Sequence, residues 1–281
     1  MREYDLAFSL GFACGCSQTL RDCGLQFASY PFDWVCSPGL AASADILTRG
    51  FDGWFRRENM RLWDVRITTG VISRLYRDVS NGFISVHDYS AANPFETGDG
   101  PVMERYARRI ASLERAIRSS RRTLAVYVEH PGNGRLDDDA LISVLDALRA
   151  KYPESGFELL YFHEDESADV PKETRVADGI VAVAADYRKR LNGEIMHVCR
   201  VETLQEYCRS RIRVPDPRSA EERSAYAERK RRNRSGRFGR CGVERWFWRK
   251  VFRFYSNVEA YLRRQRLIPD DRPIRFDGKG L

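Results

Sequence analysis

The sequence predicts an α/β protein: a mainly parallel sheet with helices on both faces, an inserted β-hairpin and a basic helical arm at the C-terminus. Short apolar runs alternate with amphipathic segments after residue 123, which is typical of a three-layer sandwich. The Asn81-Gly82 pair between two β-rich runs marks the hairpin. Apolar residues make up 43% of the 281 residues, which is enough for a large core.

The first elements are a strand, a turn and a helix. Residues 4–10 are mostly apolar, which predicts a buried strand that ends at Gly11. A short helix is expected at 13–22. A second helix is expected at 37–49, because Ser37-Pro38 offers a side-chain cap followed by a proline in the first turn.

The middle of the chain holds the hairpin, expected at 66–88. The following residues 90–101 are rich in Gly, Pro and Asn and predict a loop. An amphipathic helix is expected at 103–117, where apolar residues recur every three or four positions. Further along the chain, a helix is expected at 138–151 and strands are expected at 123–128, 157–162, 180–184 and 195–199.

The chain divides into an α/β catalytic-type domain, residues 1–212, and a basic helical extension, residues 213–281. Residues 229–266 contain fourteen Lys and Arg and two acidic residues, a net charge of +12 in a chain whose total is +7. Residues 221–234 predict a charged helix or a disordered segment. A helix expected at 242–262 has a stripe of Trp and Phe opposite arginines, and would either pack onto the domain or lie on an anionic membrane.

The cysteine usage indicates a reducing compartment. Seven cysteines follow a start without the pattern of a secretion signal, and this odd number favours free thiols in the cytoplasm. No apolar run approaches the roughly 20 residues of a spanning helix. We therefore expect a cytoplasmic protein, with any membrane contact peripheral and at the inner face. Cys14-Gly15-Cys16 has no second pair at zinc-site spacing, so no metal is expected.

The turn between the first strand and helix places Cys14 near the start of that helix. A thiol there meets unpaired amides and the positive end of the dipole, so its pKa is expected to fall and its thiolate to be nucleophilic. The same amides can hold the oxyanion that forms on a carbonyl. Cys14 is therefore the candidate nucleophile, ahead of Cys16 deeper in the helix. The candidate oxyanion and binding residues are Ser9, Gly11, Phe12, Ala13 and Gly15.

Such a thiolate needs a base, and the sequence has four histidines: His87, His130, His163 and His197. His87 ends a hairpin strand, where alternation places it on the same face as Phe83 and Ser85. His130 follows a strand and opens a turn-rich segment that also suits a cleft. His163 ends a strand before an acidic loop, whereas His197 lies inside a short apolar strand and is expected to be structural.

A third group would orient the base. Asp88 is adjacent to His87 but is expected on the opposite face of the strand. Asp33 is the better candidate, because it is set among Tyr30, Phe32 and Trp34 and its burial would require a partner. The alternative for Asp33 is a turn or cap carboxylate.

Three segments in this order and spacing, Ser9-Leu10-Gly11-x-x-Cys14, Ser29-Tyr30-Pro31-Phe32-Asp33-Trp34 and His87-Asp88-Tyr89, resemble a bacterial family of unknown function. That family, DUF1796, is labelled papain-like cysteine peptidase, and the resemblance covers roughly residues 4–165. It implies that Cys14 is the nucleophile and His87 the base, leaves the role of Asp33 open, and offers a papain-like α+β fold as the alternative. Members of the family are associated with surface polysaccharide functions.

Three functions from different classes follow. The leading one is a Cys14-dependent acyl-transfer enzyme on a small-molecule or glycan substrate, a hydrolase with water as acceptor or an acyltransferase with a sugar hydroxyl. It needs no cofactor, although acyl-CoA would suit a transferase. The second is a nucleotide-sugar or acyl-CoA-dependent carbohydrate transferase, for which neither G-x-G-x-x-G nor a P-loop is present. The third is a non-enzymatic binder of anionic surfaces, with no specific nucleic acid expected.

If residues 243–262 lie on an anionic membrane, the full chain will co-sediment with phosphatidylserine vesicles, and binding will fall as salt rises because the attraction is electrostatic. Deletion of residues 229–281 is expected to abolish this binding. Binding that survives the deletion, or that does not depend on salt, would exclude the arm as its determinant.

Overall fold

The central sheet has five strands in the order β2-β7-β8-β10-β9. The computed structural model describes residues 1–68, 71–90, 93–130, 132–168, 170–187, 189–191, 194–196 and 202–238. Neighbouring strands of the central sheet are parallel except at one edge, where β9 is antiparallel to β10. The strands are β2 (Leu6–Gly11), β7 (Thr123–Val128), β8 (Phe157–Glu164), β9 (Lys172–Ala177) and β10 (Ile180–Ala185).

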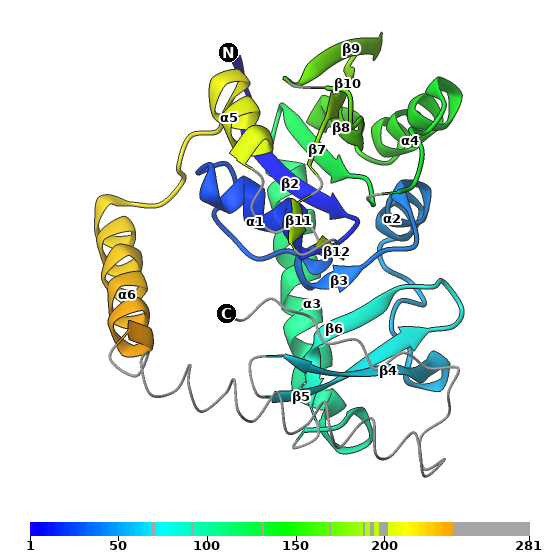
Figure 1. Cartoon of the computed structure of the whole chain (residues 1–281), viewed down its shortest axis with the longest axis vertical. Helices are drawn as coiled ribbons and strands as arrows, with labels where there is room; N and C mark the ends of the chain where they lie inside the picture. The colour runs from blue at the N-terminus through cyan, green and yellow to red at the C-terminus, as the bar shows by residue number, and fades with distance from the viewer. Residues whose placement is uncertain are drawn as a thin grey trace.

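Helices cover both faces of this sheet (Figure 1). Alternate residues of each parallel strand belong to two hydrophobic clusters; in β2, Phe8 and Leu10 join one cluster and Ala7 joins the other. The first cluster includes residues of α2 (Leu40–Thr48), α3 (Phe95–Ser119) and α4 (Asp138–Lys151), and the second includes residues of α1 (Cys14–Asp22) and α5 (Glu202–Arg211). The predicted helical layers are present, whereas the predicted parallel pairing holds for only part of the protein's β-structure.

The predicted hairpin is part of a larger antiparallel sheet with the strand order β3-β6-β5-β4. The strands are β3 (Val35–Cys36), β4 (Met60–Thr68), β5 (Val71–Asp78) and β6 (Ile84–Ser90). Strand β4 begins before the predicted range because charged residues interrupt its apolar pattern, so alternation alone does not reveal its start. The mixed architecture therefore differs from a purely doubly wound sheet.

The long helix α3 connects the two sheets. We expected a loop at 90–101, but α3 already begins at Phe95 and includes Pro101. The ring of Phe95 packs against Tyr76 and Tyr89 of the antiparallel sheet, with centroids 5.1 and 5.4 Å apart. This packing overrides the turn-like composition of the segment.

The start of α2 also differs from the prediction. The helix begins at Leu40 with Gly39 as its cap, and no side chain caps it. Ser37 does not serve as the cap, because it lies beside the turn after β2, where its amide donates to the Phe12 carbonyl at 2.7 Å. The contact between Phe12 and Ser37, which are distant in sequence, thus holds Ser37 away from the predicted capping position.

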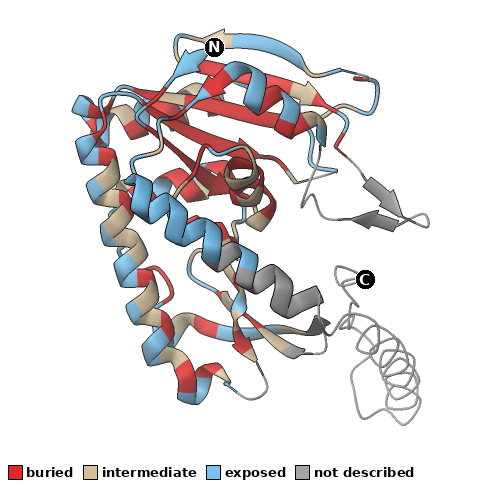
Figure 2. Cartoon of the chain, turned by 90° about the vertical axis from the view of Figure 1, so that its left-hand side faces the viewer, coloured by how far each residue is buried: buried red, intermediate tan, exposed pale blue. Residues whose placement is uncertain are grey.

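The chain after α5 returns to the N-terminus. Strand β13 (Ile212–Arg213) pairs with β1 (Arg2–Glu3), and Val214 is buried in the second cluster. Helix α6 (Ala220–Phe238) is exposed over 220–228 (Figure 2). The remaining short elements are η1 (Pro31–Trp34), η2 (Arg57–Asn59), η3 (Pro153–Ser155), β11 (Lys189–Leu191) and β12 (Glu194–Met196).

Some predictions fall outside the described residues. Of the strand expected at 195–199, only Ile195 and Met196 are described, and they lie in β12. His197 is outside the described residues. The arm helix expected at 242–262 is likewise outside the described part of the chain. Among the helices that the structure describes, none combines the length and apolarity needed to cross a bilayer.

Gly11 is expected to be intolerant of a side chain. Its φ is +117°, and an added Cβ would lie 2.9 Å from Ser37 Oγ. We therefore expect Gly11→Ala to lower the free energy of unfolding in urea by about 1–3 kcal/mol. The control is Gly134→Ala, because Gly134 has open space around it and no strained φ. Equal stability of the two variants would contradict this prediction.

Candidate active site

The turn between β2 and α1 is fixed from two sides. The Phe12 amide donates to the Val128 carbonyl of β7 at 3.1 Å, and its carbonyl accepts from the Ser37 amide at 2.7 Å. The Gly11 amide donates to the hydroxyl of fully buried Ser9 at 3.0 Å. The turn therefore lies between the central sheet and the antiparallel sheet, at the carboxyl end of β2.

Cys14 is the first residue of α1 and is partly exposed. Ala13 is the extended N-cap residue; no side chain caps the helix and no acidic residue lies in its first turn. The positive end of the helix is therefore not offset by its own side chains. By contrast, Cys16 is buried, its thiol donates to the Val126 carbonyl at 3.4 Å, and burial raises its pKa to about 12. Cys14 is thus the better placed of the two thiols for nucleophilic chemistry.

Two of the predicted oxyanion donors are already used. The amides of Gly11 and Phe12 donate to Ser9 and Val128, because the β2–β7 pairing continues into the turn. The Ser9 hydroxyl is hydrogen-bonded to the Cys16 thiol as well. The expectation that Ser9, Gly11 and Phe12 bind an oxyanion is therefore not supported. The Cys16 amide already donates to the Ala13 carbonyl at 3.2 Å. Ala13 and Gly15 stay candidates for that role, because they lie at the start of α1, where helix amides lack intrahelical partners.

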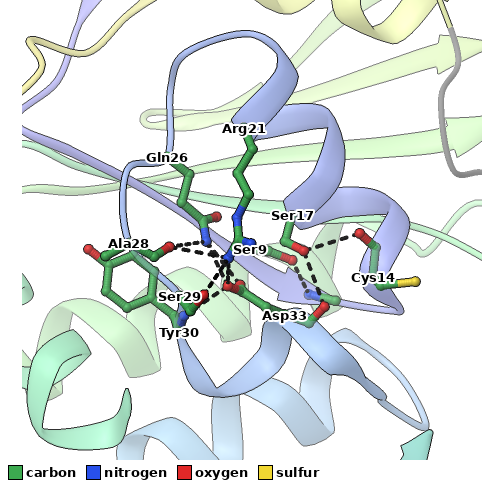
Figure 3. Close-up of polar contacts among 10 residues, drawn as sticks. Ser9, Cys14, Ser17, Arg21, Gln26, Ala28, Ser29, Tyr30 and Asp33 are labelled. Atoms are coloured by element: carbon green, nitrogen blue, oxygen red, sulfur yellow. Dashed lines mark hydrogen bonds and ion pairs between the residues drawn. The ribbon is translucent and has the colours of Figure 1, made fainter. Parts of the chain in front are cut away.

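Helix α1 packs on η1 through the face that carries Cys14. The Ser17 hydroxyl lies 3.1 Å from the Cys14 carbonyl and 3.2 Å from the Asp33 carbonyl (Figure 3). Two turns after Cys14, the Arg21 guanidinium lies over the Trp34 ring, 5.3 Å from its centroid. The spacing of three and seven residues after Cys14 places Ser17 and Arg21 on this face. From that spacing it could have been predicted that Ser17 and Arg21 lie on the same face of α1 as Cys14.

Asp33 holds η1 together from inside the protein. Its side chain is fully buried and forms an ion pair with Arg21. It also accepts from Gln26 Nε2 at 2.9 and 3.0 Å and from the Tyr30 amide at 2.8 Å. Burial raises the pKa of the Asp33 carboxyl, and Arg21 and the two hydrogen-bond donors oppose that change.

We call the contacts of Asp33 with Arg21, Gln26 and the Tyr30 amide the Asp33 clamp, because they hold these residues together. No histidine in the described part of the chain is among its partners, and in Figure 3 the Cys14 sulfur points away from the carboxylate. Asp33 therefore does not orient a histidine in this structure, contrary to our expectation.

His87 lies in a bulge of β6. Between the pairs Tyr76–Ser85 and Arg74–Tyr89, β6 has two more residues than β5, so simple alternation fails there. His87 is exposed, although we expected it on the same face as buried Ser85. Its ring meets the Trp34 ring edge-on, with centroids 5.8 Å apart.

Asp88, next in the chain, points inward. Its carboxylate accepts from Ser85 Oγ at 2.7 Å, from Arg105 at 2.8 Å and from the Tyr106 hydroxyl at 2.6 Å. These contacts attach the bulge to α3 and fix the backbone beside His87. Asp88 is therefore also a structural carboxylate.

Cys14 and His87 approach η1 from different elements. The first turn of α1 reaches the Asp33 carbonyl through Ser17, and the His87 ring reaches Trp34, the next residue. The fold thus brings the first turn of α1 and the His87 ring to Asp33 and Trp34, consecutive residues of η1. A direct contact between the thiol and the imidazole stays a prediction.

Two further histidines lie at the carboxyl edge of the central sheet. His130 follows β7, and its ring meets the Phe12 ring with centroids 4.7 Å apart. His163, in β8, stacks on Tyr161 at 5.9 Å, and burial lowers its pKa. Within the described ranges, no three His, Cys, Asp or Glu side chains converge as they would around a metal ion.

Replacing the Asp33 clamp is expected to be costly, because the substitution leaves Arg21 and Gln26 with unmatched donors. We expect Asp33→Ala to lower the free energy of unfolding in urea by about 3–5 kcal/mol. The matched control is Asp45→Ala, which removes the exposed Asp45–Arg49 pair; such pairs contribute at most about 1 kcal/mol. A similar small effect of both variants would show that the clamp is dispensable.

Comparison with known proteins gives a family but no characterised relative. No curated protein matches the chain, and no solved structure matches it. One family model, described as "Putative papain-like cysteine peptidase (DUF1796)", matches residues 5–160. This range contains β2, α1, η1, the antiparallel sheet and β7, and hence every residue of the site. The chain therefore belongs to the DUF1796 family.

Proposed function

We propose that this chain is a cysteine-dependent acyl-transfer enzyme in which Cys14 is the nucleophile and His87 the base. One observation carries the proposal: a partly exposed thiol stands at the first residue of α1, directly after a buried parallel strand. Ligands of such sheets bind outside the carboxyl ends of the strands. Membership of a cysteine peptidase family agrees with this placement.

The proposed reaction has two halves. His87 takes the proton of the Cys14 thiol, and the sulfur attacks the substrate carbonyl carbon, so that its oxygen becomes an oxyanion. The first-turn amides of α1 stabilise that oxyanion, the bond to the leaving group breaks, and His87 returns the proton to the leaving group. Water or a sugar hydroxyl then gives its proton to His87 and attacks the thioester carbon, the C–S bond breaks, and the Cys14 sulfur takes the proton back from His87.

The acceptor decides the class of enzyme. Water makes the chain a hydrolase, and a glycan hydroxyl makes it an acyltransferase that acts on a surface polysaccharide. Either reaction needs no cofactor in the protein, and acyl-CoA would supply the acyl group of a transferase. We propose the glycan as substrate because of the polysaccharide association of the family that the sequence resembles.

The thiol of Cys14 is expected to be unusually reactive. Alkylation of Cys14 by iodoacetamide, followed by mass spectrometry across pH 5–9, should show a midpoint below the value of about 8.5 for an ordinary cysteine. Cys14→Ala should abolish the release of p-nitrophenolate from p-nitrophenyl acetate, whereas Cys36→Ala, which removes another partly exposed thiol, should not. His87→Ala should slow this release by roughly 10²–10⁴-fold.

Two results would reject the proposal. One is alkylation of Cys14 at the rate of an ordinary exposed thiol throughout this pH range. The other is ester cleavage that persists in Cys14→Ala, which would place the reaction at another residue.

A further inference from the structure

The segment after β7 is a loop, and several hydrogen bonds hold its first residues in place. Glu129, 3% exposed, accepts through Oε1 from the His130 amide at 2.9 Å and from Asn133 Nδ2 at 3.0 Å. Its Oε2 accepts from the Tyr161 hydroxyl at 3.2 Å, and its carbonyl accepts from the Tyr187 hydroxyl at 2.9 Å. A buried carboxylate is costly unless its oxygens are hydrogen-bonded, and here it holds the backbone of His130.

This loop continues beside the turn that leads to Cys14. The Phe12 amide donates to the Val128 carbonyl, so the end of β7 lies beside this turn. The contact between the Phe12 and His130 rings, 4.7 Å between centroids, confirms that the imidazole reaches this turn. His130 is only half-buried, so its ring is not part of the core.

His130 reaches the turn before Cys14, and His87 reaches Trp34 of η1, from different sheets. His130 comes from the central sheet, on the side where the Phe12 amide is bonded to β7. His87 comes from the antiparallel sheet, which the Phe12 carbonyl joins through Ser37. Two imidazoles in these positions can perform separate tasks in one reaction.

The site needs a further oxyanion donor. The amides of Gly11 and Phe12 are already used, and the side-chain amide of Asn133 donates to Glu129. A neutral histidine can supply a ring N–H to a developing oxyanion. Of the side chains in this loop, His130 is the donor that contacts the turn before Cys14.

On the basis of the proposed function, we propose that His130 is a catalytic residue whose ring N–H stabilises the oxyanion formed when Cys14 attacks a carbonyl. The ring donates a hydrogen bond and transfers no proton, while His87 accepts the thiol proton. Glu129 is a positioning residue for His130. In this proposal, the substrate carbonyl oxygen binds on the side of the site that lies next to the central sheet.

Two reactions of Cys14 distinguish this role. Ester cleavage of p-nitrophenyl acetate passes through an oxyanion, whereas alkylation by iodoacetamide displaces iodide and forms none. We expect His130→Ala to lower Cys14-dependent p-nitrophenolate release by roughly 10²–10³-fold, the usual loss for one oxyanion donor, and to leave the alkylation rate within about threefold.

Variants separate a donor from a base or a structural group. His130→Gln keeps an N–H donor but cannot act as a base, so it should recover at least part of the lost ester cleavage. His87→Gln should recover nothing, because a base is missing. The matched control is His163→Ala, which removes another half-buried imidazole from the same sheet edge and should leave ester cleavage unchanged.

The outcomes are distinct. Unchanged ester cleavage in His130→Ala, an equal loss of ester cleavage and alkylation, or a His130→Gln variant no better than alanine would each overturn the inference. If His130→Ala does not fold by circular dichroism, the comparison of His130→Gln with the unmodified chain decides alone, and a loss of 10²-fold or more would overturn the donor role. Absence of Cys14-dependent ester cleavage in the unmodified chain would reject the proposed function and this role with it.

Discussion

The buried carboxylate of Asp33 is the constraint on which the site depends. It joins three parts of the chain: the end of α1 through Arg21, the connecting segment through Gln26, and the start of η1 through the Tyr30 amide. Because a buried charge without partners is very unfavourable, the three parts are held in one arrangement. This arrangement sets the distance between the helix that carries Cys14 and the residues that meet His87.

The two sheets contribute different things to the site. The central sheet provides a buried, rigid strand that ends at the turn before Cys14, and its alternating side chains are covered on both faces. The antiparallel sheet provides a bulge, in which two additional residues turn His87 outward and Asp88 inward. Because bulges redirect side chains, a base can be presented from a strand whose simple alternation would bury it. The family name implies a helix packed on an antiparallel sheet, and here a parallel sheet also supports the helix.

The sequence predicted the elements well where the pattern is local. The strand at 123–128 and the helix at 138–151 have the predicted bounds, because both follow a local apolar pattern. In the structure Asp137 also caps the helix. Prediction failed where a distant partner decides. Ser37 gives its amide to Phe12 instead of starting α2, and Phe95 packs on Tyr76 and so extends α3 into an apparent loop.

The same distinction applies to the site. Cys14 could be placed at the start of α1 from the strand-turn-helix pattern alone. The partners of Asp33 could not be predicted, because an aromatic setting indicates burial but does not say whether a histidine or an arginine supplies the positive charge. The use of the Phe12 amide by β7 could not be predicted either, since it depends on which strand lies beside β2. Hydrogen bonds between neighbouring strands therefore determine which backbone amides of the turn are already bonded.

Cys14 and Cys16 have different environments, so one helix carries a partly exposed candidate nucleophile and a buried core thiol. The two residues point to different sides of α1, since successive positions of a helix differ by about 100°. Cys16 lies against β7 in the second hydrophobic cluster, where burial favours the neutral thiol and raises its pKa. Cys14 is the partly exposed first residue of α1, a position at which backbone amides and the helix dipole favour a charged group. The motif Cys14-Gly15-Cys16 therefore combines a partly exposed candidate nucleophile with a core residue.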